Sequence, residues 1–125
     1  MLHMLQEKVL TVGELRHRFD NAWQPVDSYL RLYQPLSFDL VDPSKIVEKA
    51  IHWNGLVRQL RKRYQDFYIY LLLGRPSDDS DGGRLRAFQQ AYEALGEDRD
   101  RKELVPEEEA PRFGETVEKE IKAAA

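Results

Sequence analysis

The clearest hydrophobic pattern in the chain runs from residue 46 to residue 71. Apolar side chains recur there at alternating spacings of four and three residues, which places them on one face of a helix. They are Ile46, Ala50, Trp53, Val57, Leu60, Tyr64, Phe67 and Leu71. Asp42-Pro43-Ser44 is a typical helix start, and Gly74 is a typical helix end. The pattern predicts one long central helix over about residues 44–73.

The last part of this segment has a second interpretation. Residues 67–73 are rich in aromatic and branched apolar side chains, which favour a β-strand. The spacing of Tyr64, Phe67 and Leu71 continues the helical pattern without a break. We therefore expect a helix through residue 73 and keep a strand over residues 67–73 as the alternative.

The N-terminal part of the chain predicts shorter helices. Residues 1–10 form a short amphipathic segment. A helix is expected over about residues 12–24, because Thr11-Val12-Gly13-Glu14 has the form of a capping box and Pro25 ends the segment. A further short helix is expected from Asp27 through Tyr33. The apolar face of the 12–24 segment consists of Leu15, Phe19, Ala22 and Trp23.

The charge pattern divides the rest of the chain. Apolar residues at helical spacing predict a helix over residues 84–95 that ends at Gly96. Residues 97–125 then hold 10 acidic and 6 basic side chains, a net charge of −4. We expect a helical domain over residues 1–96 and a charged C-terminal arm over residues 97–125, with a short terminal helix as an option.

Together these elements predict an all-α fold: a small helical bundle around one long central helix, with shorter flanking helices and an extended acidic C-terminal arm. The arm adds little apolar surface to a core, and the chain has only 125 residues. Small chains bury a small share of their surface. We therefore expect burial to be completed in a homo-oligomer or in an assembly with related subunits.

Composition narrows the classes of function. The chain has no cysteine, which excludes disulfides, thiolate metal sites and thiol catalysis. It has two Asn and two Thr beside 12 Arg, a bias typical of a thermophile, although a GC-rich genome has a similar effect. No signal peptide or membrane-spanning segment is recognisable. We expect an intracellular, soluble protein of the cytoplasm, or a part of an assembled particle.

A basic cluster stands out against the net charge of −3. Residues 45–75 contain seven bases and two acids. Arg58, Arg61 and Lys62 are neighbours on one helix face and could neutralise successive phosphates. The alternative is a solvated helix face whose bases form salt bridges with the acidic tail. The predicted nucleic-acid-binding residues are Arg58, Arg61, Lys62, Arg63, Arg84 and Arg86.

Tyrosines supply a second candidate surface. The aromatic residues at helical spacing are expected in the core, but the tyrosine-rich flank exceeds what one small core covers. Tyrosine is enriched where proteins contact each other. The predicted partner-binding residues are Tyr29, Tyr33, Tyr68 and Tyr70.

Patterns that carry catalytic or metal chemistry are weak. The loop Asp78-Asp79-Ser80-Asp81-Gly82-Gly83 contains acids as a calcium loop does, but its register lacks the first ligand and the bidentate Glu. Glu48 and His52 lie one turn apart and supply two ligands, where a catalytic metal site needs three. No serine has a nucleophile motif, and no phosphate-binding glycine motif occurs. We expect no enzyme activity, no metal and no cofactor, and infer no small-molecule substrate.

The leading hypothesis is a non-enzymatic assembly protein, of the kind found as a coat or packaging subunit. It would self-associate and could hold nucleic acid on its basic face by sequence-independent backbone contacts. The alternative is an adaptor or regulator that binds a protein partner through its exposed aromatic face. A third hypothesis, an enzyme subunit that uses Glu48 and His52, requires bound metal.

Overall fold

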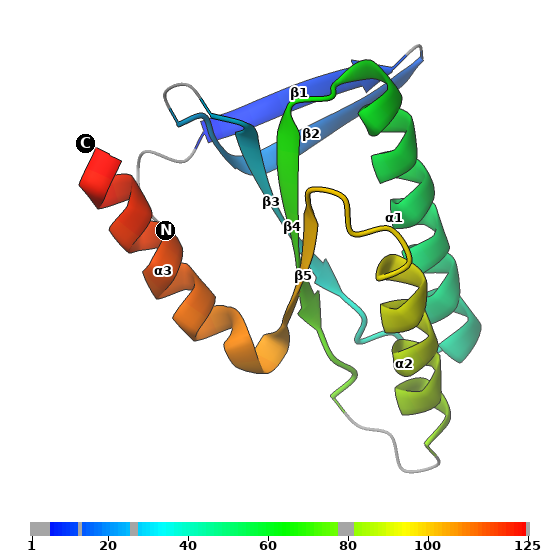
Figure 1. Ribbon diagram of the computed structural model, residues 1–125. Coiled ribbons are helices and arrows are strands. Elements are labelled where there is room, and N and C mark those ends of the chain that lie inside the picture. The colour runs from blue at the N-terminus through cyan, green and yellow to red at the C-terminus, as the bar shows by residue number, and fades with distance from the viewer. Residues whose placement is uncertain (1–5, 13, 26–27, 78–81, 125) are drawn as a thin grey trace.

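The computed structural model describes all residues except 1–5, 13, 26–27, 78–81 and 125 (Figure 1). It has a mixed α/β fold, so the predicted all-α helical bundle is wrong. In chain order the elements are β1 (Gln6–Val12), β2 (Leu15–Trp23), β3 (Leu30–Ser37), α1 (Pro43–Arg63), β4 (Phe67–Gly74), α2 (Gly83–Leu95), β5 (Lys102–Pro106), a 3₁₀ helix η1 (Glu107–Glu109) and α3 (Ala110–Ala124).

The predicted long helix ends ten residues early, at Arg63. Tyr64 adopts an extended backbone (φ −121°, ψ 111°), and its N–H still donates to the carbonyl of Leu60. Residues 67–74 then form β4, the strand that was the alternative interpretation. Every second side chain of β4 is buried in the main core, starting with Phe67 and Ile69. Two-residue alternation, rather than helical spacing, governs this segment.

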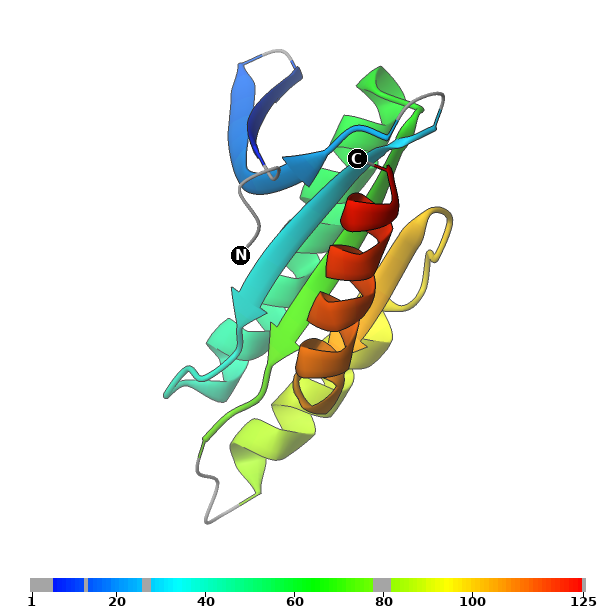
Figure 2. The same ribbon diagram turned by 90° about the vertical axis from the view of Figure 1, so that its left-hand side faces the viewer.

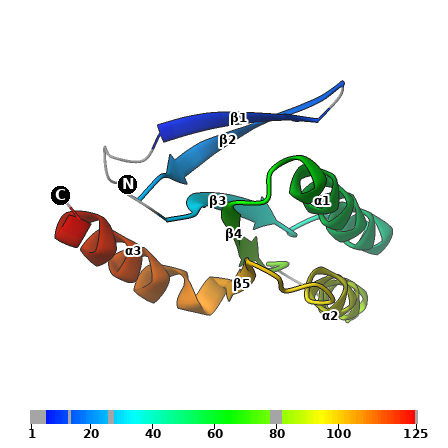
Figure 3. The ribbon, with the colours of Figure 1, turned by 45° about the horizontal axis from the view of Figure 1, so that its top comes forward.

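All five strands form one sheet in the order β1-β2-β3-β4-β5. Strands β1, β2 and β3 pair in antiparallel fashion, whereas β3, β4 and β5 are parallel. Parallel neighbours need crossover connections, and α1 and α2 supply them. Figures 2 and 3 show both crossover helices on one face of the sheet and α3 on the opposite face. Because β4 is covered on both faces, its sequence reads as a continuous apolar run.

The predicted helix over residues 12–24 is also wrong. This segment forms β2, which pairs with β1 across the chain reversal between Val12 and Leu15. Gln6 pairs with Ala22 and Lys8 with Phe19, so β2 advances three residues where β1 advances two. This β-bulge puts Phe19 and Ala22, three residues apart, into the same core. The bulge therefore reproduces the spacing of a helix in a strand.

The other predicted elements meet mixed outcomes. The segment expected to form a short helix through Tyr33 enters β3 at Leu30. The helix over residues 84–95 is confirmed as α2. Asp42 is confirmed as the N-cap of α1, because its carboxylate accepts a hydrogen bond from the Ser44 N–H at 2.9 Å. Residues 97–125, expected as a charged arm, contribute β5, η1 and α3.

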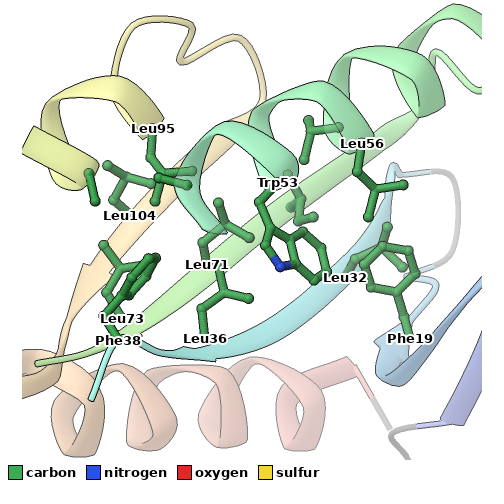
Figure 4. Packing of buried hydrophobic residues seen from close by; sticks show 14 of the residues in the cluster. Phe19, Leu32, Leu36, Phe38, Trp53, Leu56, Leu71, Leu73, Leu95 and Leu104 are labelled. Carbon is green, nitrogen blue, oxygen red and sulfur yellow. The ribbon is translucent and has the colours of Figure 1, made fainter. Parts of the chain in front are cut away.

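The main core fills the space between the sheet and the two crossover helices (Figure 4). Trp53 and Leu56 of α1 point toward the strands, where Leu32, Leu36 and Leu71 meet them. A smaller apolar cluster lies on the other face, where Val117 and Ile121 of α3 cover the sheet. No described helix has the length and apolarity that crossing a bilayer requires.

Candidate functional site

A cavity of about 200 Å³ lies between the C-terminal half of α1 and the segment that leads from α2 into β5. Crossover helix α1 runs back along the parallel strands, so its C-terminal half lies toward the end of the sheet where β4 and β5 begin (Figure 1). Four basic and three acidic side chains line it beside an amide and one apolar residue. The lining residues are Asn54, Val57, Arg58, Arg61, Lys62, Glu97, Asp98, Asp100 and Lys102.

Lys102, the first residue of β5, is the buried charged residue of the described chain, with 5 % of its surface exposed. Its ammonium donates to Asn54 Oδ1 at 3.3 Å, and the Asn54 amide donates in turn to the carbonyl of Ala94 in the last turn of α2. Burial lowers the pKa of Lys102, and the guanidinium groups of Arg61 and Arg58 lower it further. The ammonium is thus held in a setting that disfavours its charge.

Arg61 has a structural position within the wall of this cavity. Its guanidinium donates to the carbonyl of Phe67 at 2.7 Å and to that of Asp100 at 2.9 Å, and it lies 3.9 Å from the Phe67 ring centroid. Burial lowers the pKa of Arg61, with a further contribution from Arg101. Arg61 therefore joins the end of α1 to the beginning of β4 and to the loop before β5.

Arg58, Lys62 and Arg63 have different surroundings from Arg61. All three are exposed on the last turns of α1. Within the described residues, no ion pair joins any of them to a carboxylate. Helix α3 of the C-terminal segment lies across the sheet and pairs through Glu120 with Arg31 of β3. Salt bridges between the α1 bases and the acidic tail, the alternative interpretation, are absent from the described part of the chain.

Arg84 and Arg86 lie at the far end of the molecule, in the first turns of α2. The Arg84 guanidinium contacts Asp39 at 2.6 Å, and Ser77 donates to the same carboxylate through its N–H and its hydroxyl. These Ser77 hydrogen bonds, followed by Arg84, lower the pKa of Asp39. The structure therefore does not bring Arg84 and Arg86 together with the α1 bases.

The structure gathers three of the four predicted partner-binding tyrosines on the α3 side of the sheet. Tyr70 stacks on Tyr33 with ring centroids 5.2 Å apart and on Tyr68 at 4.9 Å, and Phe113 of α3 lies 5.1 Å from Tyr70. Tyr33 is 4 % exposed, so α3 occupies much of this surface. The fourth, Tyr29, is 43 % exposed and lies under the guanidinium of Arg101.

The buried tyrosines predict a loss of stability in alkali. Burial raises the pKa of Tyr70 from 10.0 to about 12. The folded state therefore holds this proton more tightly than the unfolded state, and its contribution to stability is complete below pH 10 and is lost as the pH rises toward 12. We expect the free energy of unfolding to fall over that range in denaturant titrations. In the Tyr70→Phe variant the free energy of unfolding should fall less steeply with pH. Equal slopes for variant and wild type would contradict the raised pKa of Tyr70.

Metal binding finds no support in the described residues. Glu48 forms an ion pair with Lys45 at 3.1 Å, and no group of three or more His, Asp or Glu side chains converges in the described part of the chain. His52 is exposed beside Trp53. The calcium-like loop was discounted by its register, and most of it, residues 78–81, lies outside the described residues.

Lys102, Asn54 and the acidic segment from residue 97 to residue 100 are parts of the site that sequence reasoning missed. Lys102 begins the stretch Lys-Glu-Leu-Val-Pro, in which two apolar residues stand before a proline. That pair is a weak strand signal, and it does not indicate that residue 102 is buried.

Comparison with protein-family models, with curated protein sequences and with solved structures finds no significant match. The feature of the site that bears on function is the exposed set Arg58, Lys62 and Arg63, which has no carboxylate partner in the described chain and lies next to a cavity with a buried lysine.

Proposed function

We propose that the chain is a non-enzymatic binding protein that holds the phosphate backbone of nucleic acid at the C-terminal end of α1. The observation that carries this proposal is the set of exposed bases Arg58, Lys62 and Arg63, which have no carboxylate partner in the described chain. Cations free of internal partners can release the counterions of a polyanion. Contacts to the phosphate backbone carry no sequence information, so the proposed binding is sequence-independent.

The β1–β2 hairpin extends this basic surface. The Tyr64 hydroxyl, just after α1, accepts from the Thr11 N–H at 3.1 Å and donates to the Thr11 carbonyl at 3.2 Å. Thr11 pairs with Arg16 across the hairpin, and Arg16 is exposed. The tyrosine thus holds one more exposed base close to the last turn of α1. We call Arg16, Arg58, Lys62 and Arg63 the basic end.

The charge of the opposite face supports one orientation of the nucleic acid. Helix α3 itself holds three acids (Glu115, Glu118 and Glu120) and three bases (Arg112, Lys119 and Lys122). The excess of acid on this side comes from Glu107–Glu109, which precede the helix. Helix α3 lies across the sheet from α1 (Figure 3). The segment from Glu107 to Ala124 therefore carries more acid than base, whereas the basic end carries base alone, so the net charge of −3 does not oppose the proposal.

The double variant Arg58→Glu/Lys62→Glu tests the proposal. We expect its affinity for duplex and single-stranded oligonucleotides to fall more than about tenfold at low salt, because two attractive charges become repulsive. The slope of log K against log salt should also become shallower by about 2, since each lost phosphate contact contributes about 0.9. Fluorescence anisotropy with oligonucleotides of unrelated sequence measures both quantities.

The matched control is Lys119→Glu/Lys122→Glu, which makes the same change of charge on exposed residues of α3. It should bind as the wild type does. Wild-type protein that does not bind at low salt, or a control that weakens binding equally, would contradict the proposal. Self-association remains part of the hypothesis, and light scattering on the same samples measures it.

A further inference from the structure

The cavity beside the basic end contains a buried cation whose capacity for hydrogen bonding is mostly unused. An ammonium group has three donors. In the described chain, the Lys102 ammonium makes one hydrogen bond, to Asn54 Oδ1, and that bond is long, at 3.3 Å. A buried charge is costly unless it is paired and hydrogen-bonded. Two donors of Lys102 are therefore available to a group in the cavity.

The carboxylates in the cavity wall do not meet this need. Asp98 Oδ1 accepts from the Asp100 N–H at 3.1 Å, and the Asp100 carboxylate lies 3.5 Å from the guanidinium of Arg101. No ion pair connects Lys102 to an acid in the described residues. Asp98 raises the pKa of Lys102, but burial and the neighbouring guanidiniums, Arg61 first, act in the opposite direction. Within the described residues the ammonium thus has no carboxylate at ion-pair distance, and an added anion can take that place.

Arg58 and Lys62 complete the arrangement at the rim. Both line the cavity and both are exposed, so they can contact a group that enters it. A guanidinium binds two oxygens of a phosphate at once, and an ammonium binds phosphate as a point charge. The volume of about 200 Å³ is ample for a tetrahedral phosphate group. A doubly charged phosphate monoester matches these cations better than a singly charged carboxylate does.

We propose that this cavity binds one phosphate group, with Lys102 as its buried ligand and Arg58 and Lys62 at its mouth. The group can be the terminal phosphate of a nucleic-acid strand or free phosphate. Binding to a strand end rests on the proposed function; binding of the phosphate group itself does not.

The experiment compares one oligonucleotide with a 5′-phosphate, a 3′-phosphate or hydroxyl ends, by anisotropy at constant ionic strength. At least one phosphorylated form should bind more than about tenfold more tightly than the hydroxyl form. Lys102→Met should remove this advantage, so that its affinity for the phosphorylated form falls far more than its affinity for the hydroxyl form. Inorganic phosphate, titrated against matched chloride, should shift the amide NMR signals of residues 97–102 in the wild-type protein.

The outcomes separate the two proposals. If inorganic phosphate shifts the amide signals but phosphorylated oligonucleotides bind no more tightly, the cavity is a site for free phosphate. That result overturns binding of the terminal phosphate of an oligonucleotide. Equal affinity for all ends, together with unshifted amides, overturns the cavity site. That result leaves the basic end intact if Arg58→Glu/Lys62→Glu still weakens binding. The wild-type titrations need no variant. They therefore show whether the cavity binds phosphate even if Lys102→Met does not fold.

Discussion

Replacing Ile69 with alanine is expected to lower the free energy of unfolding by about 2–5 kcal/mol. Ile69 is 0 % exposed and lies in β4, with β3 on one side and β5 on the other. Truncation removes apolar contacts and leaves a cavity that the sheet cannot close easily. Denaturant unfolding, followed by tryptophan fluorescence and circular dichroism, measures the change.

This position separates the two interpretations of the segment after α1. In a continuous helix, Ile69 would lie opposite the apolar face that contains Phe67 and Leu71, and its truncation would cost under about 1 kcal/mol. Val41→Ala is the control, because Val41 is 90 % exposed and should change stability by less than about 0.5 kcal/mol. An Ile69→Ala effect as small as that of the control would contradict the strand.

The elements that could be predicted are those whose signals are local. The N-cap at Asp42 and the extent of α2 depend on residues within a turn or two, and the structure agrees with both. The position where α1 ends depends on partners far away in sequence. Phe67 and Leu71 lie on one face at helical spacing and also at strand alternation, so periodicity within the segment could not separate the two structures.

The N-terminal hairpin was unpredictable for a related reason. A bulge in β2 places Phe19 and Ala22 on one face, which is the spacing that a helix would produce. Thr11-Val12-Gly13-Glu14 has a capping-box sequence, but the chain reverses there. Pairing with β1 and β3 decides the outcome, and pairing is not a local property.

The candidate site shows the same division. Sequence spacing correctly makes Arg58, Arg61 and Lys62 neighbours on α1. It cannot show which base turns inward, because that depends on the carbonyls at the start of β4 and before β5. It also cannot bring Lys102 to Asn54, which is 48 residues away. Arg61, one member of the predicted basic cluster, therefore has a structural role. Lys102, which lies far away in sequence, completes the cavity.

Arg61→Met is the second substitution with a large expected effect. The thioether side chain keeps the apolar stem but removes the donors to the carbonyls of Phe67 and Asp100. Hydrogen bonds from a charged group contribute about 1.5–3 kcal/mol each, and the contact with the Phe67 ring is lost as well. Removal of a half-buried cation recovers part of this, so we expect a net loss of about 3 kcal/mol in the free energy of unfolding.

Lys62→Met is the matched control for this substitution. Lys62 is the next residue on α1 and carries the same charge, but it is exposed and has no hydrogen bond or ion pair in the described chain. Its truncation should change stability by less than about 0.5 kcal/mol. Denaturant titration of both variants shows whether Arg61 has a structural role. Equal losses of stability would mean that Arg61 is an ordinary surface base. A large loss confined to Arg61→Met would separate the base that holds α1 to β4 and β5 from those available to bind phosphate.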